Sequence, residues 1–537
     1  MFYWENMVKF AKEIINFLLF KNIKTVFSYP GEQILPLYKE LNENSAVKNI
    51  MVRCESGAAH MADGYSRITN SIGVCLATAG PGATNLLTGI ATAYKDNSSI
   101  LAITGRCKKE FINKNYFQEL KMDFLNLEKG YFMNKGDISF IESRFNYSLK
   151  HKKPIHLNIP YDVLLEEVEN IDYIANNNNS NNNSNNSNNN NYNLEITENN
   201  KKILNNINFK NKNALLLIGQ GIYGTLSYNE MLKINNILSN CNIPIITTYP
   251  SRGVVNENNS SIVLGLVGGR GTENANKSIL NCDIIYSVGA SYPPSYNTIP
   301  LKIRDKVLKK IINIPININS LNDITLLVNK INENIKNNKN TNSNSINNIE
   351  NKSKNKNKKY NFKLGDYSLK IKEILDNLPD DAIITTDAGN HTVFTSLLKT
   401  CVLPKNIISS HSMGTMGFGL PTSIGVKFGC IDNKINREVV SINGDGGFQM
   451  NIQELGTISE HNLKILIIVM KNNYLNIFGK IKNPDFNKIA DGYNIDNVFI
   501  ENIENIRENI KYYLKNNKPY LMVINCENEK LPKKHFN

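Results

Sequence analysis

The chain has 537 residues, 41% of them apolar, which is enough to bury several hydrophobic cores. Its formal net charge is +13, but no basic face carries interleaved aromatic residues, so the charge does not predict a nucleic-acid partner. The eight cysteines form no CxxC pair, which is typical of small buried side chains in a reducing compartment. The N-terminal apolar run, Ile14 to Phe20, is too short to span a membrane, so we expect a cytoplasmic protein.

Two asparagine-rich stretches, residues 171–200 and 334–362, divide the sequence into three blocks and are expected to be linkers. The blocks, residues 1–170, 201–333 and 363–537, alternate short Val/Ile/Leu runs with amphipathic helical stretches. This pattern predicts three open α/β domains with parallel sheets. The expected strands are 25–29, 72–77 and 99–104 in the first block, 214–218, 243–248 and 283–288 in the second, and 382–386, 438–442, 463–470 and 520–525 in the third.

In the first block, an acidic residue precedes a helix rich in small residues. Glu55 stands in Arg53-Cys54-Glu55-Ser56-Gly57, and the run from Thr78 to Asn85 follows an expected buried strand. Glycine and proline at 80–82 predict a tight turn whose backbone can approach a flat ligand. Taken alone, Glu55 is more typical of a carboxylate favoured at a helix N-terminus by the helix dipole than of a functional acid.

The second block carries Gly219-Gln220-Gly221-Ile222-Tyr223-Gly224 after the expected strand 214–218. This GxGxxG pattern is as typical of a plain strand-to-helix turn as of a nucleotide site.

The third block carries Gly444-Asp445-Gly446, and Asn472 follows 27 residues after Asp445. We expect a helix at 449–461 and then a strand, which returns the chain to the same edge of the sheet. Glycine lets backbone approach an anion, and Mg²⁺ prefers a few oxygen ligands plus phosphate oxygens. The spacing therefore predicts a Mg²⁺ ion that holds a diphosphate, with a turn beside a polar strand end as the alternative.

These segments together closely resemble the large catalytic subunit of acetolactate synthase, one of the thiamine-diphosphate-dependent 2-oxo acid carboligases and decarboxylases. Further matching runs are Tyr29-Pro30-Gly31, Phe117-Gln118-Glu119, Ser412 to Pro421 and Gly446 to Leu455. The resemblance implies a pyrimidine-binding, a central Rossmann-like and a diphosphate-binding domain. It also implies 2-oxo acid substrates, a homodimer or homotetramer with active sites at the subunit interface, and room for a regulatory subunit.

The resemblance assigns roles by position. Glu55 matches the glutamate that hydrogen-bonds the pyrimidine nitrogen, Gln118 a glutamine near the reacting carbon, and Met416 the side chain under the bend of the cofactor. The Mg²⁺ ligands would be Asp445, Asn472 and the backbone carbonyl of Tyr474. The cofactor-binding positions are Gly31, Pro81, Asn85, Asp387, Gly389, Asn390, His391, Gly414, Met416, Gly444, Gly446 and Gly447, with Asn390 in place of the family's usual glutamine.

The sequence departs from the family in three places, one of which is a short tail after the expected strand 520–525. After Tyr474 the family's loop with a Gln-Trp pair is shortened, and the only tryptophan in the chain is Trp4. In the second block, Gly289-Ala290-Ser291-Tyr292-Pro293-Pro294 and Asn313-Ile314-Pro315-Ile316 replace segments that hold flavin, which argues against FAD.

We therefore expect an acetolactate synthase-like transferase or lyase of branched-chain amino acid biosynthesis that uses thiamine diphosphate and Mg²⁺, with pyruvate as the donor. The alternatives are a non-carboligating 2-oxo acid decarboxylase, favoured by the shortened loop, and a non-catalytic paralogue. A flavoprotein ranks last, because it rests on one GxGxxG.

Overall fold

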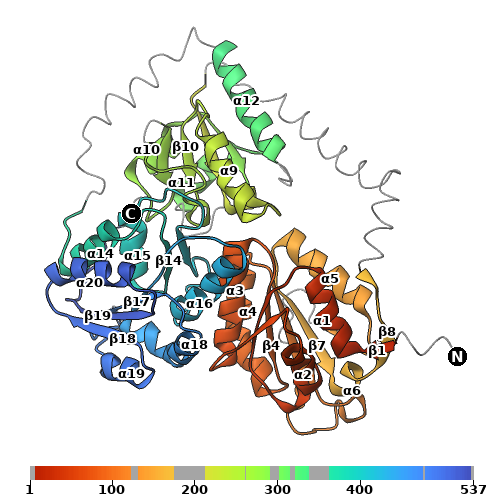
Figure 1. The fold of residues 1–537 in the computed structure, drawn as a ribbon. Helices are drawn as coiled ribbons and strands as arrows, with labels where there is room; N and C mark the ends of the chain where they lie inside the picture. The colour runs from red at the N-terminus through yellow and green to blue at the C-terminus, as the bar shows by residue number, and fades with distance from the viewer. Residues whose placement is uncertain are drawn as a thin grey trace.

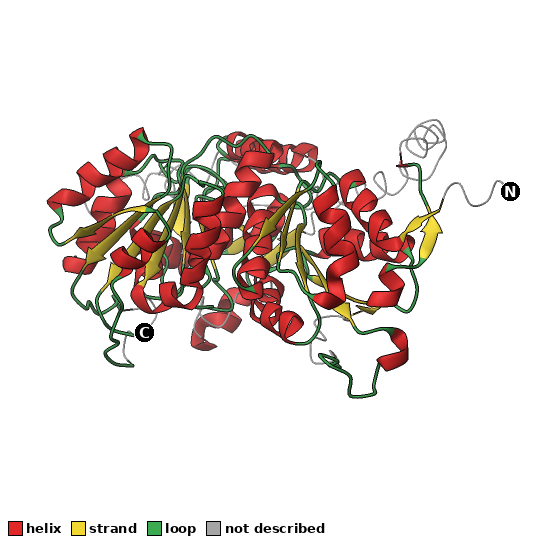
Figure 2. Cartoon of the chain, turned by 60° about the horizontal axis from the view of Figure 1, so that its bottom comes forward, coloured by secondary structure: helices red, strands yellow, loops and turns green. Residues whose placement is uncertain are grey.

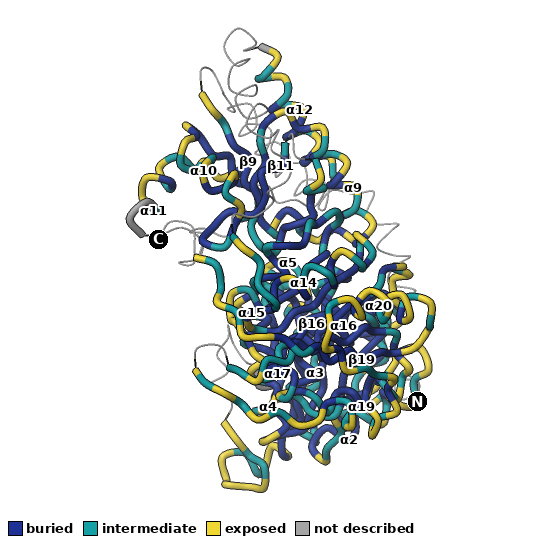
Figure 3. The backbone as a smooth tube through the Cα atoms, turned by 90° about the vertical axis from the view of Figure 1, so that its left-hand side faces the viewer, coloured by how far each residue is buried: buried dark blue, intermediate teal, exposed yellow. Residues whose placement is uncertain are grey.

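The structure is a computed structural model that describes residues 7–121, 131–173, 212–259, 262–290, 301–314, 321–337, 362–475 and 478–533. Three parallel sheets, each covered by helices, make up these residues (Figures 1 and 2). The expected fold class is confirmed. Strand residues are mostly buried, whereas exposed residues lie on the outer sides of helices and on loops (Figure 3).

The first domain has a six-stranded parallel sheet in the order β3-β2-β4-β5-β7-β6. Its strands are β2 (Thr25–Ser28), β3 (Lys48–Met51), β4 (Gly73–Ala77), β5 (Ile100–Arg106), β6 (Tyr131–Phe132) and β7 (Ile155–Pro160). Its helices are α1 (Phe10–Phe20), α2 (Leu35–Glu43), α3 (Glu55–Thr69), α4 (Pro81–Asp96), α5 (Ile138–His151) and α6 (Tyr161–Leu164). A separate antiparallel pair, β1 (Met7–Lys9) and β8 (Glu167–Glu169), closes one side.

The third domain repeats this topology with the order β15-β14-β16-β17-β19-β18. Its strands are β14 (Ile383–Thr386), β15 (Ile407–Ser409), β16 (Val439–Gly444), β17 (Leu466–Lys471), β18 (Asp496–Ile500) and β19 (Tyr520–Asn525). Its helices are α14 (Asp366–Asn377), α15 (Asn390–Leu398), α16 (Gly419–Asp432), α17 (Asp445–Phe448), α18 (Leu455–Glu460), α19 (Phe486–Gly492) and α20 (Glu504–Lys515).

The central domain has a five-stranded parallel sheet in the order β11-β10-β9-β12-β13. Its strands are β9 (Ala214–Ile218), β10 (Ile245–Thr247), β11 (Val263–Leu266), β12 (Ile284–Val288) and β13 (Ile311–Ile314). Its helices are α9 (Tyr228–Leu238), α10 (Glu273–Asn281), α11 (Leu301–Leu308) and α12 (Leu321–Asn337).

Helices α3 and α16 join the first and third domains and lie side by side between them (Figure 1). Glycines allow this close approach. A Cβ atom at Gly64 of α3 would overlap the Thr422 carbonyl, and one at Gly425 of α16 would overlap the Met61 carbonyl. Because side chains are absent at both crossing points, the two backbones meet directly and hold the domains in one arrangement.

The expected single helix at 449–461 is wrong. Helix α17 begins at Asp445 itself, a 3₁₀ segment follows at Gln449–Glu454, and α18 ends at Glu460. Asn451 interrupts the helical path with φ −134° and ψ 27°. Its side-chain amide donates to the Gly417 carbonyl at 2.6 Å, so a tertiary contact replaces regular helix geometry there.

All eight cysteines are free and seven are buried, as the spacing predicted. Across the described ranges, no helix is long and apolar enough to cross a membrane.

Candidate active site

In both six-stranded sheets the strand order reverses at a fixed point, between β2 and β4 and between β14 and β16. Ligands of open α/β sheets bind outside the carboxyl ends of strands at such points. The segments singled out from the sequence follow these strands directly. Gly31 follows β2 and Pro81 follows β4, while Asp387 follows β14 and Asp445 follows β16.

The first group of side chains surrounds Glu55, which begins helix α3 and is partly exposed. The Asn85 side-chain amide on α4 donates a hydrogen bond to Glu55 Oε2 at 3.0 Å. A Cβ atom at Gly82 would lie 3.3 Å from Glu55 Oε1, so glycine leaves room for the carboxylate there. The structure thus brings together Glu55, Pro81 and Asn85 at the start of two adjacent helices.

The other pyrimidine-side residues line the same edge of the sheet. A Cβ atom at Gly31 would overlap Thr78, whose hydroxyl is buried without a hydrogen-bond partner. Gly80 has a φ of +56° and lies against Gln118, whose φ is +59°. An ion pair between Arg106 and Glu119 fixes the loop next to Gln118. These residues therefore form one edge with Glu55.

The second group surrounds Asp445, which is buried at the end of β16. Its Oδ2 accepts hydrogen bonds from the backbone N–H groups of Asn472 at 3.1 Å and Asn473 at 2.7 Å. The Asn483 amide donates to the same oxygen at 2.7 Å, and the Gly446 N–H donates to Oδ1 at 2.9 Å. Four N–H donors hold this carboxylate in place.

Asn472 follows β17, and its side-chain oxygen accepts from the Tyr474 N–H at 3.0 Å. Asp445 Oδ1 and Asn472 Oδ1 each accept a single hydrogen bond, so each oxygen keeps a lone pair for a metal ion. Within the described ranges, no group of three His, Cys, Asp or Glu side chains could hold a metal. The oxygen set expected from the sequence, one carboxylate with amide and carbonyl oxygens, fits Mg²⁺.

A short hairpin follows this pair. Tyr474 and Lys480 form an antiparallel bridge, and the Leu475 N–H donates to the Gly479 carbonyl at 2.8 Å. Phe478 at its tip is 84% exposed. A Cβ atom at Gly446 would overlap the Leu475 side chain, so the hairpin lies against the glycine-rich turn.

Sequence reasoning missed Asn483 and Gln449. Gln449 donates to the Asp445 carbonyl at 3.1 Å and to Asn483 Oδ1 at 2.8 Å, and Asn483 also donates to Asn473 Oδ1 at 2.8 Å. In a chain this rich in asparagine, nothing in the sequence separates Asn483 from its neighbours. Only the path of the hairpin brings it to Asp445.

Two polar atoms beside β14 lack partners. Asn390 Oδ1 and His391 Nε2 are buried without a hydrogen bond. Burial lowers the pKa of His391 to about 4, so its imidazole is neutral. Gly389 and Gly444 pack on this ring, with Cβ positions that would lie 2.7 and 3.1 Å from it. A phosphate oxygen only accepts hydrogen bonds, so of these two atoms only His391 Nε2, in the tautomer that carries its proton, fits a phosphate group.

The Asp387 carboxylate makes its hydrogen bonds to backbone groups of its own domain. Burial raises the pKa of its carboxyl to about 7, and its oxygens accept from the Ala388, Gly417 and Phe418 N–H groups at 2.7, 3.0 and 3.4 Å. A Cβ atom at Gly447 would overlap this carboxylate. Asp387 therefore fixes the backbone next to Met416 through hydrogen bonds within its own domain.

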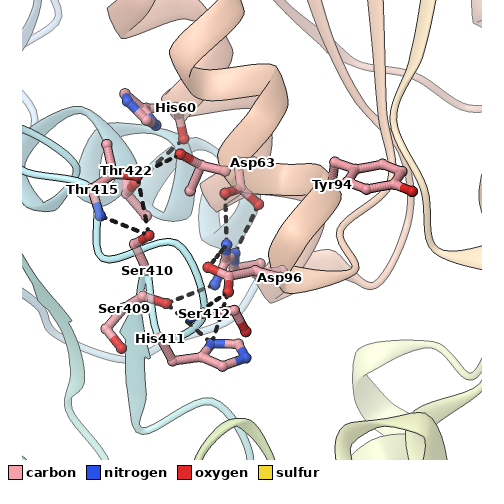
Figure 4. Close-up of polar contacts among 12 residues, drawn as sticks. His60, Asp63, Tyr94, Asp96, Ser409, Ser410, His411, Ser412, Thr415 and Thr422 are labelled. Atoms are coloured by element: carbon pink, nitrogen blue, oxygen red, sulfur yellow. Dashed lines mark hydrogen bonds and ion pairs between the residues drawn. The ribbon is translucent and has the colours of Figure 1, made fainter. Parts of the chain in front are cut away.

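The loop that precedes Met416 is held by the first domain (Figure 4). Asp96 accepts from the Ser412 N–H at 2.8 Å and lies 3.5 Å from His411, while Arg67 donates to the Ser409 carbonyl at 2.9 Å. Met416 remains 38% exposed. Gly414 has a φ of +69° and open space around its Cβ position, so its backbone conformation, not crowding, favours glycine.

The carboxylates of Glu55 and Asp445 share no hydrogen-bond partner among the described residues.

The GxGxxG turn of the central domain serves packing. A Cβ atom at Gly219 or Gly221 would overlap or crowd the backbone of Gly289 and Ala290. The turn forms the 3₁₀ segment Gln220–Tyr223, and α9 begins only at Tyr228, whereas a dinucleotide fingerprint opens a helix. It borders a cavity of about 690 Å³ between the domains. Residues 291–294 and 315–316, where flavin segments were expected to be replaced, lie outside the described residues.

The chain has two parallel sheets of one topology, and each sheet carries an acidic group and glycine turns at its switch point. This arrangement is typical of proteins that bind a phosphorylated cofactor. Family models identify the family. Residues 8–127 match the N-terminal TPP binding domain of thiamine pyrophosphate enzymes, 201–332 their central domain and 387–524 their C-terminal TPP binding domain. The chain belongs to the thiamine pyrophosphate enzyme family, and the resemblance expected from its motifs is confirmed.

Individual relatives match nearly the whole length of the chain. A probable acetolactate synthase large subunit of Methanococcus aeolicus is 31% identical over 95% of this chain and 91% of its own length. The acetolactate synthase large subunit of Cyanidium caldarium is 30% identical over 95% and 92%. An uncharacterized protein of Methanocaldococcus jannaschii is 54% identical over 98% and 99%.

Proposed function

We propose that this protein is an acetolactate synthase-like enzyme that decarboxylates a 2-oxo acid, with pyruvate as donor, and transfers the two-carbon unit to a second 2-oxo acid. The observation that carries this proposal is the pairing of two switch-point sites on one topology, Glu55 with Asn85 and Asp445 with Asn472. The enzyme would act in branched-chain amino acid biosynthesis, and it would be located in the cytoplasm.

Asp445, Asn472 and the Tyr474 carbonyl would hold Mg²⁺, and the donors to the diphosphate would be the Asn390 side-chain N–H group and His391 Nε2 in the tautomer that carries its proton. When bound, thiamine diphosphate would supply a nucleophilic ring carbon and a cationic ring that serves as the electron sink for decarboxylation of the 2-oxo acid. Glu55 holds a proton at the pyrimidine nitrogen, and Asn85 orients its carboxylate at 3.0 Å. Met416 would contact the bound cofactor, and Gln118 would face the substrate.

A second copy of the chain would complete each site. Glu55 and Asp445 have separate partners, and apolar side chains near both groups are exposed, namely Phe117 at 69%, Met416 at 38% and Met450 at 58%. Exposed apolar surface of this kind is typical of protein interfaces. We infer a homodimer or homotetramer, which light scattering after size-exclusion chromatography would detect.

The shortened hairpin favours a second candidate, a decarboxylase that releases an aldehyde. Purified protein with thiamine diphosphate, Mg²⁺ and pyruvate would be tested for acetolactate, acetaldehyde and CO₂ separately. Acetolactate supports the proposal, and acetaldehyde alone supports the decarboxylase. Failure to release CO₂ from any 2-oxo acid would contradict both. The same sample, scanned near 450 nm, tests the expectation that FAD does not bind.

A further inference from the structure

A buried carboxylate of the third domain accepts hydrogen bonds from the two backbone N–H groups directly before Glu55. Glu454 is fully buried at the end of the 3₁₀ segment. Its Oε1 accepts from the backbone N–H groups of Arg53 at 3.1 Å and Cys54 at 3.0 Å, and its Oε2 accepts from the Thr457 hydroxyl at 2.8 Å. Two of the three donors lie in the other domain, about 400 positions away.

This contact provides a hydrogen-bond acceptor at the start of α3. Cys54 is the N-cap of α3, and its own side chain makes no capping hydrogen bond. The N–H group of an N-cap residue has no partner within its own helix, and Glu454 accepts from this group of Cys54 out of the third domain. A Cβ atom at Gly57 would overlap Glu454 Oε1, so glycine on the first turn of α3 lets the carboxylate reach the backbone.

Neighbouring contacts hold the same turn. The Ser56 hydroxyl donates to Asn451 Oδ1 at 3.2 Å, and Asn451 in turn donates to the Gly417 carbonyl, next to Met416. The Arg53 side chain pairs with Glu460 at the surface. The first turn of α3 is thus fixed by the domain that carries Met416 and Asp445.

A buried carboxylate is costly unless its hydrogen bonds are complete. Among the described residues, the hydrogen-bond partners of Glu454 are two backbone amides and a hydroxyl, with no arginine or lysine side chain. A costly group held at this position, one residue from the start of α3, indicates that the first residues of this helix must be placed accurately.

We propose that Glu454 is a positioning residue for Glu55: it fixes the start of α3 so that the Glu55 carboxylate meets the pyrimidine nitrogen. This inference rests on the proposed role of Glu55. A glutamine at 454 can accept both backbone N–H groups through its oxygen and donate to the Thr457 hydroxyl, so it should preserve the geometry. Alanine removes the acceptor and leaves two amides unpaired.

The first measurement needs no cofactor. Hydrogen–deuterium exchange, read by mass spectrometry on peptides that cover residues 50–60, should be at least tenfold faster at the Arg53 and Cys54 amides in Glu454→Ala. Glu454→Gln should exchange like the unmodified protein, and Gly57→Ala should resemble Glu454→Ala. Glu460→Gln, which removes only the surface pair with Arg53, is the matched control and should change little.

The second measurement separates positioning from general stability. Exchange of the C2 proton of bound thiamine diphosphate and kcat should both fall about tenfold in Glu454→Ala, while KM and the calorimetric affinity for the cofactor with Mg²⁺ stay unchanged. Unchanged amide exchange in Glu454→Ala, or loss of cofactor affinity in parallel with kcat, would overturn the inference. If no 2-oxo acid is turned over by the unmodified protein, the proposed function fails, and amide exchange still tests the grip of Glu454 on α3.

Discussion

The first and third domains share one strand order, but their carboxylates differ in burial and in hydrogen-bond partners. In the first domain, Glu55 is partly exposed and bonded to one side-chain amide, and the deeper Asp96 pairs with Arg67 at 3.0 Å. In the third, Asp445, Asp387 and Glu454 are buried, with hydrogen bonds from N–H and hydroxyl groups of the chain.

The difference follows from the proposed chemistry. A carboxylate that shares a proton with a cofactor needs a free face, which Glu55 has. One that binds a metal must keep a fixed orientation, which four N–H donors secure at Asp445. The same topology therefore serves two tasks because the turns after the strands differ. Substitutions in each domain, and the response of each domain to pH, can test this contrast.

The largest effect is expected from Glu55→Gln. An amide cannot exchange the proton, so turnover should fall by about 10² to 10⁴, the usual contribution of a positioned acid or base. Circular dichroism and melting should match the unmodified protein, because Glu55 is partly exposed. Glu43→Gln, at the exposed end of α2, is the control and should keep full activity. Turnover within about threefold of the unmodified enzyme would contradict the mechanism.

Asp445→Asn should weaken the Mg²⁺-dependent binding of thiamine diphosphate roughly a hundredfold, or about 2.7 kcal/mol. The change removes the charge of the metal ligand and forces one amide N–H to face donors from Asn473 and Asn483. Titration calorimetry with and without Mg²⁺ measures the effect. Asp485→Asn is the matched control, because asparagine also caps α19 well. Equal affinity with and without Mg²⁺ in the unmodified protein would sink the metal assignment.

The two domains should respond to pH with opposite sign. Burial raises the pKa values of Asp387 and Glu454 to about 7, so the stability that they contribute is complete below their ordinary pKa and is lost as pH rises through 7. Burial alone would raise the pKa of Asp96, but Arg67 and His411 hold it below its ordinary value, so its contribution is lost in acid.

Scanning calorimetry from acidic to basic pH would measure this contrast. The melting midpoint should fall by about 1 °C between about pH 6 and 8 for each kcal/mol lost. Asp387→Asn and Glu454→Gln should flatten the basic side of the profile, and Asp96→Asn the acidic side. A profile that these variants leave unchanged on both sides would show that other groups control the pH dependence.

The smallest effect on stability is expected from Phe478→Ala. Its side chain is 84% exposed at the hairpin tip, so the free energy of unfolding should change by less than about 0.5 kcal/mol. If the hairpin faces the second substrate, the ratio of acetolactate to acetaldehyde should change several-fold. Lys482→Ala, in the segment after the hairpin, serves as the control. An unaltered product ratio would separate the hairpin from acceptor choice.

Much of the fold could be read from particular residues. The runs at 214–218 and 520–525 are strands with the expected bounds, because buried parallel strands need continuous apolar residues. The 27-residue interval between Asp445 and Asn472 did lead back to the same sheet edge, where the Asn472 N–H reaches Asp445 Oδ2. The roles assigned to the site residues and the expected domain boundaries stay predictions.

The expected helix at 449–461 failed because local periodicity cannot show that Asn451 bonds to Gly417, 34 residues earlier. Glu454 was missed for the same reason, since two of its three partners lie about 400 residues away and are backbone amides, which leave no sequence signature.

By itself, the sequence determined the family, the three parallel-sheet domains and the motifs at the strand ends, because glycine turns, buried strands and an acid at a helix start depend on short-range chemistry. The tertiary structure alone decided how the two halves meet. It placed Asn483 on Asp445, pointed Asp387 inward, and set Glu454 under the first turn of α3. Those contacts depend on where distant backbones pass, which no local pattern encodes.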